Sequence, residues 1–460
     1  MIKRSILVLF LLLPFIAANA IGDNLPKPTP KQMGWHNAEI GVVFHYDLHV
    51  FDNKRYEQGD NRISPIQDYN IFSPDSLDTD QWILAAKSAG ARFAILTVTH
   101  ETGFALYQSD VNPFCMKALK WRDGQGDIFR DFVNSCRKYG VMPGVYIGIR
   151  WNAFLGIHNF KAEGGGEFAK KRQIWYKKMC EQMVEEICSR YGDLFLIWFD
   201  GGADDPRGDG PDVEPIVAKY QPGCLFYHNV DKADFRWGGS ESGTVGYPCW
   251  SAFPYPFSHS NKTDAEEHNK LLIHGDKNGK YWVPAMADAP LRGANGRHEW
   301  FWEPGDENAV LPLDSLVNMY YKSVGRNATL IIGLTPDTAG LIPAGDAQRL
   351  KEMGDEINRR FAAPIAATSG QKNTLTVNLN GEKPVNHCII QENIINGERI
   401  RAYKVEAKIN GKWRTVCEGS SVGHKRIERF PTVKASAVRL TVTKSVLQPD
   451  ILNFSIFNID

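Results

Sequence analysis

Two acidic residues stand in surroundings that suit nucleophilic or acid–base chemistry. In the run Ile197–Gly202 (IWFDGG), Asp200 follows three apolar residues and precedes two glycines. Such a run predicts a buried strand, and glycine permits a tight turn and the close approach of a ligand. Asp200 would then project from the strand end into a site. The alternative is that Asp200 only caps the turn, because Asp-Gly is a common turn pair.

The second acid is Glu241, in the Gly/Ser-rich segment Arg236–Gly243 (RWGGSESG), with Trp237 and Trp250 on either side. Desolvation by indole rings raises the pKa of a carboxyl, as a general acid requires. Cleavage of a glycosidic bond needs two carboxyls, one to attack the sugar or activate water and one to protonate the leaving oxygen. Asp200 and Glu241 are therefore the candidate catalytic pair. The alternative for Glu241 is a solvated position in a loop.

Composition narrows the classes of protein and of site. The chain has 460 residues and a formal net charge of zero. The length favours two domains, and the charge balance argues against nucleic-acid binding. The eight cysteines form no C-x-x-C pair, which disfavours a zinc ribbon. Most of them lie in apolar stretches, which is typical of buried free thiols, although export would permit disulfides. The expected chemistry needs no metal and no cofactor.

The first twenty residues have the pattern of a signal peptide. Lys3 and Arg4 precede the apolar run Ile6–Ile16, and Ala18-Asn19-Ala20 is a small-residue cleavage site. The apolar run is shorter than the roughly 20 residues that span a bilayer, and no later segment is apolar enough to do so. We therefore expect an exported protein, periplasmic or secreted, with residues 1–20 removed.

From about residue 35 to residue 335, apolar strands alternate with amphipathic helices. The clearest predicted strands are Gly41–Tyr46, Phe93–Thr99, Val145–Ile149, Leu194–Phe199 and Thr329–Leu334. Weaker candidates are Leu225–His228, a stretch near Gly246–Trp250, and Trp282–Ala285. This alternation predicts an α/β fold, a (β/α)8-like TIM-type barrel over residues 21–362. In such barrels the site forms at the carboxyl ends of the strands, where this chain has polar or aromatic residues: His45, Tyr46, His100, Glu101, Arg150, Trp151 and Asp200.

After residue 362 the composition changes. Leu375–Leu379, Ile400–Ile409 and Ala437–Thr443 alternate apolar with polar residues, and turn pairs such as Asn380-Gly381 lie between them. Short alternating strands separated by turns predict an all-β sandwich over residues 363–460. The sandwich could bind glycan or support the barrel. Because no sugar-binding residues are visible in it, support is the preferred interpretation.

Several motifs resemble the family 29 glycoside hydrolases, the α-L-fucosidases. Trp198–Gly201 (WFDG) matches the nucleophile motif, and RWGGSESG resembles the acid/base motif of the branch that acts on α-1,3/4 linkages. Trp121–Tyr146 is similar to the family's second helix and third strand, and Tyr320–Pro343 to its last helix and strand. The resemblance covers most of residues 33–362. The tail resembles the galactose-binding or discoidin-like sandwich of many members.

This resemblance implies an exo-acting, retaining enzyme that releases terminal α-L-fucose from glycans, a carbohydrate substrate. It places the nucleophile on Asp200 and the acid/base on Glu241. The motif Phe44–Tyr46 (FHY) matches the first-strand histidine that contacts fucose hydroxyls. The candidates for holding the sugar are His45, Tyr46, His100, Glu101 and Trp198, and those for the leaving-group side are Arg150, Trp151 and Trp237. For Arg150, a structural ion pair is an equal alternative.

The chain departs from the family pattern in two places. Thr99–Phe104 (THETGF) has Glu101 where typical members have a second histidine, and Pro284–Asp288 (PAMAD) has Met286 where the branch has a glutamate that binds the second sugar. Asp288 and Arg292 still fit the pattern, and Arg292 is a further candidate for binding the substrate. Two alternatives follow: the same mechanism on an L-fucose-like sugar such as α-L-galactose, or a non-catalytic glycan-binding protein on the same fold. Retention of both catalytic acids argues against the second. The oligomeric state stays open.

Overall fold

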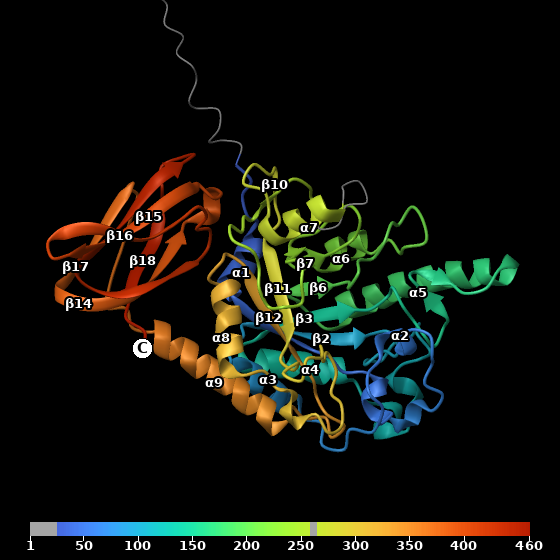
Figure 1. The fold of residues 1–460 in the computed structure, drawn as a ribbon. Coiled ribbons are helices and arrows are strands. Elements are labelled where there is room, and N and C mark those ends of the chain that lie inside the picture. Colours follow the sequence, from blue (N-terminus) through green and yellow to red (C-terminus); the bar gives the residue numbers. More distant parts are fainter. Residues whose placement is uncertain (1–24, 258–264) are drawn as a thin grey trace, which may run out of the picture.

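The computed structural model describes residues 25–257 and 265–460, and the predicted signal peptide lies outside the described residues. Eight parallel strands form a nearly closed barrel in the order β7-β6-β3-β2-β1-β12-β11-β8 (Figure 1). Its strands are β1 (Ile40–Phe44), β2 (Phe93–Thr99), β3 (Met142–Ile147), β6 (Leu196–Trp198), β7 (Leu225–Tyr227), β8 (Arg236–Trp237), β11 (Ala285–Pro290) and β12 (Thr329–Leu334). The predicted (β/α)8-like barrel is thus confirmed.

One weak strand prediction was wrong. The stretch Gly246–Trp250 contains no strand; the strand of that region is β8, which pairs with β11. With only two residues, β8 is too short to produce an apolar pattern in the sequence. The segment after it is taken up by contacts with the C-terminal domain, including a hydrogen bond from the Ser251 amide to Glu398.

Helices cover the outside of the barrel, and two of them, α3 (Thr79–Ser88) and α4 (Ile128–Tyr139), begin at aspartate caps. Asp78 and Asp127 accept hydrogen bonds from backbone amides at the starts of α3 and α4, and α4 ends at Gly140 with a φ of 69°. The helices are α1 (Pro30–Ala38), α2 (Gln58–Asn61), α3 (Thr79–Ser88), α4 (Ile128–Tyr139), α5 (Gly166–Arg190), α6 (Glu214–Tyr220), α7 (Ala265–His274), α8 (Leu313–Lys322) and α9 (Ala344–Phe361). None of those described is long and apolar enough to cross a membrane.

The barrel interior shows the two-residue period of its strands. Val43, Phe93, Leu196 and Ile331 are fully buried and pack on one another inside the barrel, while the residues between them face the helices. Gly41 lies beside Phe93, and a Cβ at position 41 would fall 2.1 Å from the Phe93 ring. This layer forms the floor on which the site is built.

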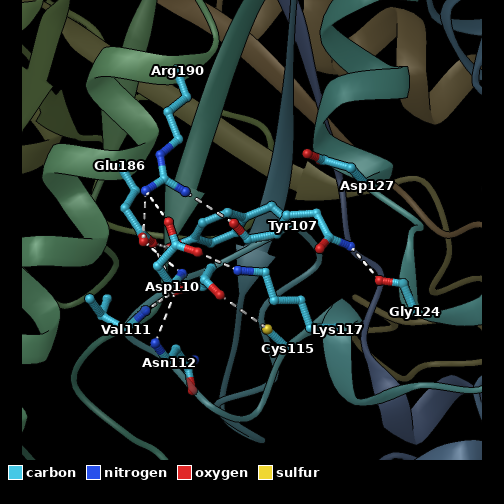
Figure 2. A network of polar contacts seen from close by, with 12 residues as sticks. Tyr107, Asp110, Val111, Asn112, Cys115, Lys117, Gly124, Asp127, Glu186 and Arg190 are labelled. Atoms are coloured by element: carbon cyan, nitrogen blue, oxygen red, sulfur yellow. Dashed lines mark hydrogen bonds and ion pairs between the residues drawn. The ribbon is translucent and has the colours of Figure 1, made fainter.

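A polar network fixes the long loop after β2 (Figure 2). Glu186 on α5 is buried and accepts hydrogen bonds from the Tyr107 hydroxyl at 3.0 Å and the Asp110 amide at 2.7 Å. Arg190, one turn later, contacts Glu186 at 3.1 Å and Asp110 at 2.7 Å, and Lys117 also pairs with Asp110. The network ties the loop to α5 only a few residues beyond His100 and Glu101.

The C-terminal domain (orange to red in Figure 1) lies beside the barrel, and α9 leads into it. Its six antiparallel strands have the order β13-β18-β14-β17-β15-β16. The strands are β13 (Ala366–Gly370), β14 (Thr374–Glu392), β15 (Ile400–Ile409), β16 (Lys412–Gly419), β17 (Arg426–Ser445) and β18 (Ile451–Phe457). Both ends of the long strand β14 contribute to one apolar core, through Leu375 and Val377 at one end and Cys388 and Ile390 at the other. This confirms the predicted sandwich.

Each of the eight cysteines of the chain is a free thiol, and seven are buried.

Candidate active site

Asp200 and Glu241 line one pocket of about 440 Å³ at the carboxyl ends of the barrel strands. Asp200 comes two residues after β6, and Glu241 lies in the loop after β8. The other residues lining the pocket are His45, Tyr56, Gln58, His100, Tyr146, Trp198, Asp288 and Trp300. The pocket is large enough for a monosaccharide and is surrounded by aromatic rings and polar groups.

Strand geometry explains why Asp200 points into the pocket. Leu196 and Trp198 face the barrel interior, so the two-residue period carries Asp200 onto the same face, one layer higher. Gly201 and Gly202 follow with φ values of 67° and 86°, in the left-handed region. Side chains rarely adopt this backbone conformation, so the turn favours glycine at both positions.

The carboxyl of Asp200 is open to solvent in the pocket but surrounded by protein atoms. Oδ2 accepts a hydrogen bond from the Tyr146 hydroxyl at 3.1 Å. Desolvation raises the pKa of Asp200 and the negative charge of Glu241 raises it further, while His100 and the Tyr146 hydrogen bond oppose the rise. The charge of Glu241 thus affects the ionisation of Asp200, as expected of two carboxyls in one site.

Glu241 is held by a different part of the chain. Its Oε2 accepts a hydrogen bond from Trp300 Nε1 at 2.9 Å and lies 3.0 Å from His298 Nδ1, which donates to the same oxygen when the imidazole proton is on Nδ1. Both donors come from the loop 291–312 between β11 and α8. Because both contacts use Oε2, Oε1 is left to exchange a proton with a bound molecule.

His45 and His100 follow β1 and β2 and also line the pocket. Burial lowers the pKa of each imidazole, so both are neutral and can donate one hydrogen bond and accept another. His100 stacks on the Tyr146 ring with centroids 5.4 Å apart. His45 lies 5.0 Å from the Trp300 ring. Neutral imidazoles on aromatic walls suit the hydroxyls and the apolar face of a sugar.

A second pocket of about 410 Å³ adjoins the first and shares three of its residues: His100, Tyr146 and Asp200. Glu101, Arg62, Arg150 and Trp151 line this second pocket. Both oxygens of Glu101 are engaged, one by the Tyr56 hydroxyl at 2.8 Å and the other by Arg62 Nε at 2.7 Å. Glu101 therefore orients two neighbours of the pocket and has no oxygen without a hydrogen bond.

Comparison with known proteins assigns the family. Residues 26–360 match the sequence model of the α-L-fucosidases, and residues 346–453 match that of the F5/8 type C domain. The chain belongs to the α-L-fucosidase family. The α-L-fucosidase 1 of Arabidopsis thaliana is 26% identical over 470 residues, which cover 92% of this chain and 86% of the relative.

Solved structures of α-L-fucosidases and family 29 glycoside hydrolases have the same fold as this chain. A crystal structure from Bacteroides thetaiotaomicron, classed as an α-L-fucosidase, is 71% identical with a TM-score of 0.94 and covers 95% of this chain and 100% of that one. A family 29 glycoside hydrolase from a rumen bacterium is 27% identical, with a TM-score of 0.78, over 95% of this chain and 78% of that chain. The predicted membership of the family 29 fucosidases is thus confirmed, and with it a glycoside hydrolase.

Three residues predicted to bind substrate do not line either pocket of this fucosidase family member. Tyr46 faces away from the barrel interior and packs on Phe72 and Trp82, because it follows the inward-facing His45 on β1. Arg292 is buried in an ion pair with Asp346, with nitrogen–oxygen distances of 2.8 and 3.0 Å.

Trp237 is the third, and it acts through a neighbour. Its Nε1 donates to Asp288 Oδ1 at 2.9 Å, and Asp288 lines the first pocket.

Arg150 lines the second pocket, and its Nε donates to Asn159 at 2.8 Å. Within residues 25–257 and 265–460, Arg150 forms no ion pair, so the alternative of a structural ion pair is not what the structure shows. The other predicted residues border the pockets: His45 and Trp198 the first, Glu101 and Trp151 the second, and His100 both.

Met286 also has a different place from the one its sequence position suggested. The side chain is fully buried in the barrel interior, next to Trp198 and Ile331, one layer below Asp288 on the same face of β11. It cannot contact a second sugar from there. Met286 therefore belongs to the apolar core of the barrel and offers no polar group to the pocket.

Six residues of the site were missed by sequence reasoning. Tyr56, Gln58 and Arg62 come from the segment between β1 and β2, Tyr146 from β3, and His298 and Trp300 from the loop after β11. The segment 298–302 (HEWFW) is unusually aromatic for a surface loop. That composition was the one available signal, since large exposed aromatic groups beside polar residues are typical of binding sites.

Proposed function

We propose that the protein releases terminal α-L-fucose from glycans as a retaining exo-glycosidase, with Asp200 as nucleophile and Glu241 as acid/base. The observation that supports this assignment is the placement of both carboxyls in one pocket with contrasting surroundings. Asp200 sits among Tyr146, His100 and Trp198 and accepts a hydrogen bond from a tyrosine hydroxyl, whereas Glu241 is held by Trp300 and His298. Two carboxyls with different environments are what double displacement requires.

In the first step Asp200 attacks the anomeric carbon while Glu241 Oε1 donates its proton to the leaving oxygen. The glycosidic bond breaks, and an ester forms between the sugar and Asp200. In the second step Glu241, now ionised, takes a proton from water, and the water oxygen displaces Asp200. The sugar leaves with its original anomeric configuration. Trp300 and His298 hold Oε2 through both steps and so keep Oε1 directed at the reacting oxygen.

The anomer formed first tests this mechanism. Proton NMR of the wild-type protein on an aryl α-L-fucoside is expected to show the α anomer before mutarotation. A β product would contradict the assignment of Asp200 as nucleophile. Trapping with a 2-fluoro-fucosyl fluoride and peptide mass spectrometry is expected to place the covalent sugar on the peptide that contains Asp200.

The sugar and the linkage belong to the same proposal. We favour α-L-fucose, and we favour α-1,3/4-linked substrates because the RWGGSESG segment resembles that branch. α-L-Galactose differs from fucose by a hydroxyl on C6, which needs a polar partner. A panel of 4-nitrophenyl α-L-fucoside and α-L-galactoside, followed by α-1,2-, α-1,3- and α-1,4-fucosylated oligosaccharides, separates these cases by kcat/KM. A preference for the galactoside would contradict the assignment of the sugar.

For the sandwich we propose a supporting role for the loop of Glu241. The segment after that loop is held by the sandwich: the carboxylate of Glu398 accepts from the Ser251 amide at 3.0 and 3.1 Å, and the Ser420 amide donates to the Tyr247 hydroxyl at 2.7 Å. The guanidinium of Arg426 lies 3.9 Å from the Tyr247 ring. Tyr247→Phe keeps the ring and removes the hydroxyl contacts, so we expect about 1 kcal/mol less unfolding free energy and a lower kcat. An unchanged kcat would contradict this role.

We further propose that the protein is exported, to the periplasm or the medium. The support is the charged start, apolar run and Ala18-Asn19-Ala20 site of residues 1–20. Mass spectrometry of protein purified from its own cells should give Ile21 as the first residue. A mature chain that begins at Met1 would contradict export by this route.

A further inference from the structure

The loop 291–312 contains an acidic cluster, and one member, Glu303, accepts a hydrogen bond at 3.1 Å from the amide of Tyr56, which lines the pocket. Glu299, Glu303 and Asp306 each contribute an oxygen to a group in which all three atoms lie within 4.8 Å of one another. Glu299 and Glu303 are 1% and 5% exposed, and Asp306 is half-buried. Three carboxyls so close and so little exposed repel one another unless a cation or a proton compensates them, and burial together with the neighbouring carboxyls raises the pKa of Glu299 to about 7.

Arg297 supplies only part of that compensation. Its guanidinium hydrogen-bonds both oxygens of Glu303, at 2.5 and 2.8 Å. It lies 3.7 Å from Glu299 and 3.6 Å from Asp306, beyond hydrogen-bonding distance. Within the described residues these are the ion pairs of the cluster, so one positive charge faces three carboxyls.

The buried carboxyl of Glu299 provides a second, independent observation. Its Oε1 accepts a hydrogen bond from Asn295 Nδ2 at 2.5 Å. Its Oε2 is fully buried and has no hydrogen-bond partner among residues 25–257 and 265–460. A buried carboxylate oxygen without a donor is rare in native proteins, and a bound ion is one of the few explanations for it.

We propose that Glu299, Glu303 and Asp306 bind a divalent cation, with Ca²⁺ as the ion. All donors are oxygens, which selects hard cations over zinc or copper. Ca²⁺ holds its ligands at about 2.3–2.6 Å, so oxygens up to roughly 5 Å apart can share one ion. It also accepts six to eight ligands in flexible geometry, which leaves room for water and backbone carbonyls beside three carboxylates.

The position of the site gives the ion a function. Glu299 lies between His298 and Trp300, whose nitrogens hold Glu241. A cation on the carboxyl of Glu299 would fix the backbone from which both donors extend. The ion acts by positioning Glu241 and takes no part in bond breaking, so its binding is independent of the sugar that the pocket accepts.

Calorimetric titration of the full-length, chelator-treated protein with CaCl2 tests the site directly. We expect one ion per chain, with a Kd on the order of 10⁻⁴ M, in the range of calcium sites in extracellular modules. Glu299→Gln should raise the Kd at least ~10-fold, because it removes one charged ligand. Asp355→Asn, an exposed carboxyl on α9 that pairs with Lys351, is the matched control and should bind like the wild type.

Terbium luminescence provides a second measurement on the same variants. Tb³⁺ replaces Ca²⁺ on oxygen ligands, and excitation of Trp300 and Trp302, which flank the cluster in the sequence, should sensitise its emission. Asp306→Asn serves beside Glu299→Gln, since Asp306 is partly exposed and its substitution spares the buried side of the loop. Absence of binding by the wild type would overturn the site, as would equal affinity in the wild type and both variants. Neither readout depends on turnover.

Discussion

The turn of Asp200 and the loop of Glu241 line one pocket, but they are built on different principles. Asp200 follows a buried strand directly, and the strand's alternation and two glycines decide where it points. Glu241 follows a two-residue strand, and its place depends on His298 and Trp300, distant in sequence. A substitution near Asp200 should therefore act on chemistry alone, whereas the position of Glu241 should respond to changes far from it.

Asp200→Gly is expected to have the largest effect. Without the nucleophile no covalent intermediate forms, so kcat should fall by ~10³-fold or more on aryl fucosides. Because Asp200 is solvent accessible in the pocket, its loss should leave the unfolding free energy nearly unchanged. Azide, which fits the space of the missing carboxyl, should restore part of the turnover and give a β-fucosyl azide, detectable by NMR. Full activity without azide would contradict the role of Asp200.

Glu241→Ala should have the second largest effect, and its size should depend on the leaving group. A positioned general acid contributes about 10²- to 10⁴-fold. The loss should be near the upper value for an oligosaccharide, which leaves as a poor alcohol, and much smaller for 2,4-dinitrophenyl fucoside, which needs no proton. Steady-state kcat/KM on both substrates provides the measurement. An equal loss on both would argue against acid catalysis by Glu241.

The contrast between the two regions also explains what the sequence could predict. Apolar runs at β1, β2, β3, β6 and β12 indicated the barrel, and the alternation of β6 indicated that Asp200 faces inward. The same alternation, applied to β1, places His45 inside and Tyr46 outside, so that the prediction of both as ligands went beyond the pattern. A bulge in β2, with Thr97 and Thr99 opposite successive residues of β3, turns His100 into the pocket against the simple period.

Contacts between distant segments could not be read in this way. His298 and Trp300 meet Glu241 across 57 and 59 residues, and no local pattern encodes such a pairing. Arg292 fitted the family pattern, yet its partner Asp346 is 54 residues away on α9 and removes it from the pocket. The direction of a side chain at a strand end depends on the local sequence and can be predicted from it. The position of the acid/base loop depends on contacts between distant segments, which the sequence pattern does not reveal.

The substitution Trp300→Phe tests whether the loop 291–312 positions Glu241. The substitution keeps an aromatic wall for His45 but removes the hydrogen bond from Nε1 to Glu241. A hydrogen bond to a charged group contributes about 1.5–3 kcal/mol, so kcat on an oligosaccharide should fall roughly 10-fold or more. As a control, Trp175→Phe changes a half-exposed indole on α5 and should leave kcat as it is. Equal activity of Trp300→Phe and the wild type would show that the loop does not position Glu241.

The smallest expected effect is a change in pH dependence on the Asp200 side. The nucleophile must be ionised, and desolvation raises its pKa, so kcat/KM should fall with decreasing pH at a higher pH than for an ordinary aspartate. The Tyr146 hydrogen bond stabilises the ionised form and opposes this rise. Tyr146→Phe should therefore move the acid limb of the profile to still higher pH. An acid limb that stayed at the wild-type pH would show that the Tyr146 hydrogen bond does not control the ionisation of Asp200.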